Sequence, residues 1–183
     1  DLTGTEDELE EFYGSLGEIY KDNVDIILCE SMSSIFEGSN ASKVAKEFSD
    51  RVWLSWTNRG HQPNQLPSTE ALSKAVDFSI EADVECTLIN CSHADMASNS
   101  IKELKRASRF GIFANSSTFK EVDLSVATKD VDAIHHLNSE EISAKEYAMI
   151  ALSWAKEGAF VVGGCCGTTV EHTREIKLLM DSL

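Results

Sequence analysis

Short hydrophobic runs alternate along this chain with segments in which hydrophobic residues recur every three or four positions. The runs have the length of buried strands and cover residues 24–28, 52–56, 86–89, 110–113 and 159–162. The helical pattern covers residues 9–16, 41–48, 147–154 and 176–183, and weaker versions of it cover 68–82 and 97–107. This regular alternation predicts an α/β fold with a parallel sheet.

Start and stop signals support several of these helices. The spacing of a capping box, in which a hydroxyl residue is followed three positions later by Glu, occurs at Thr5 and Glu8, Ser143 and Glu146, and Thr168 and Glu171. Gly158 is placed to end the helix before the last strand.

Polar groups capable of chemistry follow four of the five predicted strands. They are Glu30, Asn90-Cys91-Ser92, Asn115-Ser116 and Cys165-Cys166. A (β/α)8 TIM barrel collects the carboxyl ends of its strands into one site, whereas an open doubly wound sheet usually has an early phosphate loop, and no G-x-G-x-x-G or P-loop motif is present. We therefore expect the barrel.

The chain has 183 residues, and a complete barrel typically needs about 250. Five strands are predicted instead of eight, and the sequence opens with Asp1. We expect residues 1–183 to form one barrel domain that lacks roughly three N-terminal βα units.

Charge and hydropathy narrow the class of protein. With 16 Lys and Arg against 31 Asp and Glu, the formal net charge is −15, which disfavours broad nucleic-acid binding. No hydrophobic run approaches the length of a membrane span, and the first residues do not resemble a signal peptide. A cytoplasmic protein is expected, with no nucleic acid or membrane partner.

Five cysteines without a secretion signal favour metal binding or catalysis over a disulfide framework. Cys165 and Cys166 are adjacent between glycines, which let the backbone leave strand geometry so that both sulfurs can point to one place. Together with Cys91 they suit a three-thiolate zinc site with an open fourth position, a site built for alkyl transfer to sulfur. Cys29 and Cys86 lie in hydrophobic runs and are expected in the core.

The chain resembles the zinc-dependent homocysteine S-methyltransferase family along almost its whole length. The motifs that carry this resemblance are Leu28-Cys29-Glu30-Ser31-Met32, Ile89-Asn90-Cys91-Ser92, Ala114-Asn115-Ser116 and Gly163-Gly164-Cys165-Cys166-Gly167-Thr168-Thr169. The resemblance implies a (β/α)8 barrel, zinc bound by Cys91, Cys165 and Cys166, and a Glu30 carboxylate that holds the amino group of homocysteine. The family's N-terminal Asp-Gly-Gly segment, another substrate contact, has no counterpart in this sequence.

The reaction implied is attack of the homocysteine thiolate on an electrophilic methyl group, which gives methionine. S-methylmethionine, S-adenosylmethionine, betaine and methylfolate relayed through cobalamin all serve such enzymes, and the sequence does not choose among these donors. It contains no cobalamin-binding segment, which favours a sulfonium donor or a stand-alone enzyme.

Two other functions stay open. The adjacent cysteines could form a redox pair that cycles through a disulfide, or the chain could be a noncatalytic zinc-binding fragment of a barrel. His135 and His136 are interpreted as residues of a solvated loop, and His61 as a loop residue on the catalytic face that could contact the methyl donor.

Overall fold

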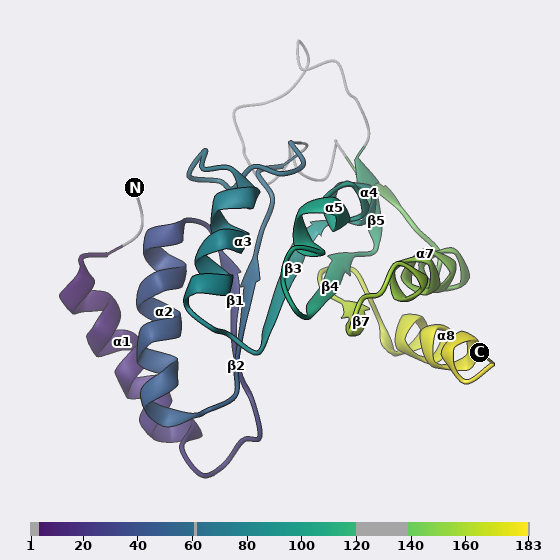
Figure 1. The fold of residues 1–183 in the computed structure, drawn as a ribbon. Coiled ribbons are helices and arrows are strands. Elements are labelled where there is room, and N and C mark those ends of the chain that lie inside the picture. Colours follow the sequence, from purple (N-terminus) through teal and green to yellow (C-terminus); the bar gives the residue numbers. More distant parts are fainter. Residues whose placement is uncertain (1–3, 61, 120–138, 183) are drawn as a thin grey trace.

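The computed structural model describes residues 4–60, 62–119 and 139–182, and its centre is a five-stranded parallel sheet (Figure 1). In spatial order the strands are β1 (Ile27–Met32), β2 (Val52–Trp56), β3 (Cys86–His93), β4 (Phe110–Asn115) and β7 (Val161–Gly164). Every pairing between neighbours is parallel. The α/β class and the parallel sheet are therefore confirmed, and β1 and β7 are the two edge strands.

Helices precede, connect and follow these strands. They are α1 (Glu6–Tyr20), α2 (Ile35–Phe48), α3 (Leu72–Glu81), α4 (Ala94–Asn99), α5 (Ile101–Leu104), α7 (Ala144–Lys156) and α8 (Val170–Met180). Strands β5 (Ser117–Phe119) and β6 (Ser139–Glu141) form a separate antiparallel pair. Helices α1 and α2 lie together beside β1, and α7 and α8 lie together at the opposite end of the molecule (Figure 1).

The core lies between the sheet and the helices. Trp56 of β2 is fully buried there, and its indole N–H donates to the Ser79 hydroxyl of α3 at 3.0 Å. Trp53 is three positions earlier in the strand, so it points to the opposite face, where it meets the ring of Phe160 edge to face. Phe160 is 53% exposed. One face of the sheet is therefore covered by helices, while the other leaves large apolar side chains open to solvent.

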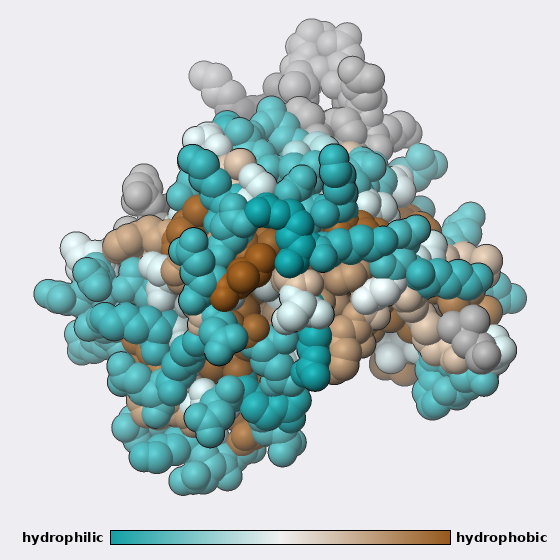
Figure 2. Space-filling model, viewed as in Figure 1, coloured by the Kyte–Doolittle hydropathy of each residue, from teal (hydrophilic) through white to brown (hydrophobic). Residues whose placement is uncertain are grey.

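The surface is hydrophilic over most of the face in Figure 2, with a band of hydrophobic residues across its middle. None of the helices in the described part of the chain combines the length and hydrophobicity needed to cross a bilayer. The cytoplasmic location stays a prediction.

The close packing of α2 on β2 gives a test of the core. Alanine at Gly38 is expected to lower the free energy of unfolding by about 1 to 2 kcal/mol, even after its gain in helix propensity. The added Cβ would lie 2.4 Å from a ring carbon of Trp56, which is buried and cannot move aside. Urea unfolding of Gly38→Ala measures this change.

Gly14→Ala in α1 is the matched control, because a Cβ at Gly14 would meet no atom within 4 Å. That variant is expected to gain about 0.5 to 1 kcal/mol. Equal effects of the two substitutions would contradict the close contact between Gly38 and Trp56.

Several predicted boundaries were wrong, mostly at the carboxyl ends of strands. The first strand was predicted at 24–28 and is Ile27–Met32, and the last was predicted at 159–162 and is Val161–Gly164. Ladder hydrogen bonds continue into polar and glycine residues that a hydrophobic pattern does not mark. The helix predicted at 97–107 is instead the short helices α4 and α5, interrupted at Ser100, whose hydroxyl donates to the Met96 carbonyl.

Two of the three predicted capping boxes are confirmed, at Thr5 with Glu8 and at Ser143 with Glu146. The third is wrong. The Thr168 hydroxyl donates to the Cys165 carbonyl at 2.7 Å, so the cap of α8 moves to Thr169, whose backbone N–H donates to Nδ1 of His172.

Candidate metal and substrate site

The polar residues singled out from the sequence do gather at the carboxyl edge of the sheet. Glu30 lies near the end of β1, Asn90 and Cys91 lie near the end of β3, and Asn115 is the last residue of β4. Cys165 directly follows β7. His61, His135 and His136 fall outside the described residues.

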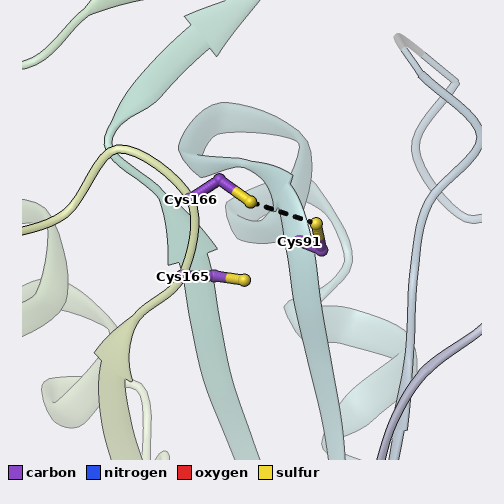
Figure 3. Close-up of side chains that lie close together, drawn as sticks. All are labelled: Cys91, Cys165 and Cys166. Atoms are coloured by element: carbon purple, nitrogen blue, oxygen red, sulfur yellow. Dashed lines mark hydrogen bonds between the residues drawn. The ribbon is translucent and has the colours of Figure 1, made fainter.

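Three cysteines form a cluster at this edge. The sulfurs of Cys91, Cys165 and Cys166 all lie within 4.8 Å of one another, and the Cys91 and Cys166 sulfurs are 3.6 Å apart (Figure 3). Cys91 comes from β3 and the other two from the loop after β7, with β4 between these strands. Cys165 and Cys91 are half-buried and Cys166 is exposed, so the cluster can be reached from solvent.

The loop that carries Cys165 and Cys166 is hydrogen-bonded to the end of β4. The Cys165 N–H donates to the Ala114 carbonyl at 2.8 Å, and the Cys166 N–H donates to Oδ1 of Asn115 at 3.1 Å. The Ser116 N–H donates to the Cys166 carbonyl at 3.0 Å. These bonds turn both sulfurs toward Cys91.

Two backbone features complete the arrangement. Gly167 has φ +77°, a conformation that glycine adopts without strain, and it lets the loop turn sharply after Cys166. Cys91 itself has φ +51°, and the register of β3 against β4 shifts between Asn90 and His93. Such bulges re-aim side chains beside functional sites, and here the bulge brings the Cys91 sulfur to the loop.

A buried tyrosine supports the same region. The Tyr147 hydroxyl of α7 lies 2.7 Å from the Ala114 carbonyl and 2.8 Å from the Gly163 carbonyl, so it holds the ends of β4 and β7 together. This role was not predicted from the sequence, because Tyr147 fitted the apolar face of a helix.

The thiols of the cluster influence each other's ionisation. A hydrogen bond from the Cys91 thiol is the main reason that the pKa of Cys165 lies below its ordinary value, and burial acts in the opposite direction. The same hydrogen bond, followed by burial, raises the pKa of Cys91. One thiolate is therefore stabilised at this site before any metal binds.

This lowered pKa predicts unusual reactivity in the metal-free protein. Alkylation of Cys165 by iodoacetamide is expected to slow by less than about threefold between pH 8 and pH 6, because its thiolate persists as the pH falls. An ordinary thiol with a pKa near 8.5 would slow about tenfold per pH unit. Peptide mass spectrometry after timed quenching measures each cysteine separately.

The two cysteines outside the cluster serve as internal references. Both are buried as predicted, and burial raises the pKa of Cys29 and of Cys86 to about 12. Both are expected to stay unmodified over the same pH range. A tenfold fall in the alkylation rate of Cys165 for each pH unit would contradict its stabilised thiolate.

The donor set fits a thiophilic metal such as zinc. With Zn–S bonds near 2.3 Å, two sulfurs of a tetrahedral site are about 3.8 Å apart, close to the 3.6 Å between Cys91 and Cys166. In the described part of the chain, no further histidine, cysteine or carboxylate joins this group. Three thiolates would hold the ion and leave one position for another ligand.

Glu30 is not part of the cysteine cluster. Its side chain is exposed at the end of β1, an edge strand that β2 separates from β3. The next residue, Ser31, has φ +62° and lies where the register between β1 and β2 shifts. The carboxylate and the sulfurs thus lie at one edge of the sheet, on strands at some distance from each other.

Comparison with known proteins decides the family. A family model described as homocysteine S-methyltransferase matches residues 1–180. The chain belongs to this family.

Relatives agree with this assignment. The curated homocysteine S-methyltransferase YbgG of Bacillus subtilis strain 168 is 25% identical in an alignment of 183 positions that covers 98% of this chain and 54% of YbgG. The metallated form of the homocysteine methyltransferase MmuM from Escherichia coli superposes with a TM-score of 0.74 at 18% identity, covering 98% of this chain and 54% of MmuM. The apo form of MmuM superposes with a TM-score of 0.71 at 17% identity, covering 97% of this chain and 58% of MmuM. The chain shares the fold of MmuM and spans about half the length of these relatives.

Proposed function

We propose that this chain carries the metal site and part of the homocysteine site of a zinc-dependent methyltransferase that forms methionine. The observation that carries the proposal is the convergence of three sulfurs, from β3 and from the loop after β7, in a member of this family. Cys91, Cys165 and Cys166 are the proposed metal ligands and Glu30 the proposed substrate ligand.

Zinc bound at this cluster would lower the pKa of the homocysteine thiol, which is otherwise only a few per cent ionised at pH 7. The side chains of the chain have other tasks. The three cysteines hold the ion in an anionic sulfur environment, and Glu30 selects a substrate that carries an ammonium group. In the reaction the homocysteine sulfur forms a bond to the methyl carbon, the bond from that carbon to the donor breaks, and the thiol proton leaves to solvent.

The same proposal includes the architecture of a (β/α)8 barrel, of which residues 1–183 supply the C-terminal portion. Among the described residues, the edge strands β1 and β7 each pair with one neighbour in the sheet, and the relatives are nearly twice as long as the matched region. A cavity of about 420 Å³ runs along β1, lined by Tyr13 and Gly17 of α1 and by Leu28 and Glu30 of β1. An additional strand at the β1 edge would cover this cavity.

The proposal is tested by metal analysis and a methyl-donor panel. Both this chain and a longer protein that contains it should bind about one zinc per chain. With homocysteine as acceptor and S-methylmethionine, S-adenosylmethionine, betaine or methylfolate as donor, mass spectrometry should detect methionine for the longer protein. Absence of zinc, or absence of methionine from every donor with the zinc-loaded longer protein, would overturn the proposal.

The redox alternative was predicted for the adjacent Cys165 and Cys166. In the structure Cys91 and Cys166 are a second pair to consider, because their sulfurs are 3.6 Å apart and a small movement would permit a disulfide. The redox alternative predicts loss of free thiols on mild oxidation and no bound metal. A zinc-binding protein that forms no methionine would instead support the noncatalytic fragment.

A further inference from the structure

Asn90, the residue before Cys91, places a buried amide between the two halves of the proposed site. Its side chain is 1% exposed and therefore does not reach the solvent-facing edge where substrate would bind. Instead it extends from β3 to the end of β1. There it makes two hydrogen bonds with Ser31, the neighbour of Glu30.

The hydrogen bonds of the Asn90 side chain define which end of its amide accepts and which end donates. The Ser31 N–H donates to Oδ1 of Asn90 at 2.9 Å, and Nδ2 of Asn90 donates to the Ser31 hydroxyl at 2.7 Å. Because a backbone N–H can only donate, these bonds fix which end of the amide faces Ser31. The Ser55 hydroxyl of β2 donates to the same Oδ1 at 2.6 Å. One side chain therefore connects the ends of β1, β2 and β3.

These bonds hold Ser31 in a backbone conformation that serine does not adopt readily. Ser31 has φ +62°, and the β1 register shifts there. A strained residue keeps such a conformation only when its surroundings fix it. The bonds from Asn90 supply that restraint at the residue directly bonded to Glu30.

We infer that Asn90 is a positioning residue, which sets the Glu30 carboxylate in register with the metal-binding Cys91 so that the amino group and the sulfur of one homocysteine molecule are held together. The inference rests on the proposed function. Asn90 acts through Ser31 and touches neither the substrate nor the metal.

The test compares Asn90→Ala with Ser55→Ala in the longer, zinc-loaded protein. Asn90→Ala removes both bonds to Ser31 and is expected to raise the KM for homocysteine roughly 10- to 100-fold, with zinc content and the KM for the methyl donor unchanged. Ser55→Ala removes one buried bond to the same amide and leaves Ser31 held, so its KM for homocysteine is expected to stay within about threefold of the wild type.

Hydrogen exchange gives a readout that does not depend on activity. The Ser31 amide should be protected in the wild type and in Ser55→Ala, and should exchange much faster in Asn90→Ala.

An unchanged homocysteine KM in Asn90→Ala would overturn the inference alone, and if the zinc content were also lower, Asn90 would have a purely structural role. An equal rise in the KM of both substrates would overturn it too. A wild-type protein that neither binds nor methylates homocysteine would overturn the proposed function as well, which keeps the two failures distinguishable.

Discussion

Serine at position 165 is expected to empty the metal site and to lower methyl transfer to homocysteine by more than about 100-fold. Loss of a group that only supports a metal ligand already costs 10- to 100-fold in affinity or activity, and Cys165 is itself one of three proposed ligands. A serine hydroxyl stays protonated at neutral pH and binds zinc poorly in place of a thiolate. Zinc content by elemental analysis and methionine formation by mass spectrometry measure the two effects in Cys165→Ser.

The matched control is Cys86→Ala, which removes a thiol that lies in the core and outside the cluster. It is expected to cost about 1 kcal/mol of stability and to keep zinc and activity. A Cys165→Ser protein that retained both would remove the basis for the three-cysteine site.

Glutamine at position 30 is expected to lower kcat/KM for homocysteine by about 2 kcal/mol, or roughly 30-fold. The substitution keeps the shape of the side chain and removes the charge that is proposed to bind the substrate ammonium. Because Glu30 is exposed, water screens part of this interaction and keeps the expected effect at the low end for a charged pair. Steady-state kinetics of Glu30→Gln, with zinc content checked, provide the measurement.

A substrate analogue makes this test sharper. 4-Mercaptobutyrate lacks the amino group of homocysteine, so the wild type should use it poorly, whereas Glu30→Gln should discriminate little between the two thiols. Glu81→Gln, at the end of α3, removes another exposed charge and should behave as the wild type. Unchanged discrimination in Glu30→Gln would show that another group recognises the ammonium.

The sequence predicted the order of the five strands of the parallel sheet and the edge of that sheet that carries the site, because hydrophobic periodicity and the position of polar residues after strands are local signals. It also predicted the meeting of Cys91 with Cys165 and Cys166, although 74 residues separate the first two, since parallel strands bring their carboxyl ends together. It did not predict the antiparallel strands β5 and β6.

What the sequence could not reveal depends on the third dimension. The bulges at Ser31 and Cys91 change the direction of two strands without any Gly or Pro to mark them. The bonds of Asn90 and Tyr147 join residues distant in the chain. Asn90 was predicted only as a polar residue after a strand, and Tyr147 only as part of the apolar face of a helix, so neither pattern indicated the partner. Helix α8 is capped at Thr169 because the Thr168 hydroxyl donates a hydrogen bond to the Cys165 carbonyl instead. That contact depends on the turn of the loop.

The hydrogen bonds between the cysteine loop and β4 also bear on how the protein would exchange its metal. In a zinc finger the ion organises the chain, and a chelator unfolds it. Here main-chain and amide bonds at Ala114, Asn115 and Ser116 already hold the loop, and none of them uses a sulfur. A chelator should therefore strip the ion and leave a folded protein that accepts zinc again without refolding.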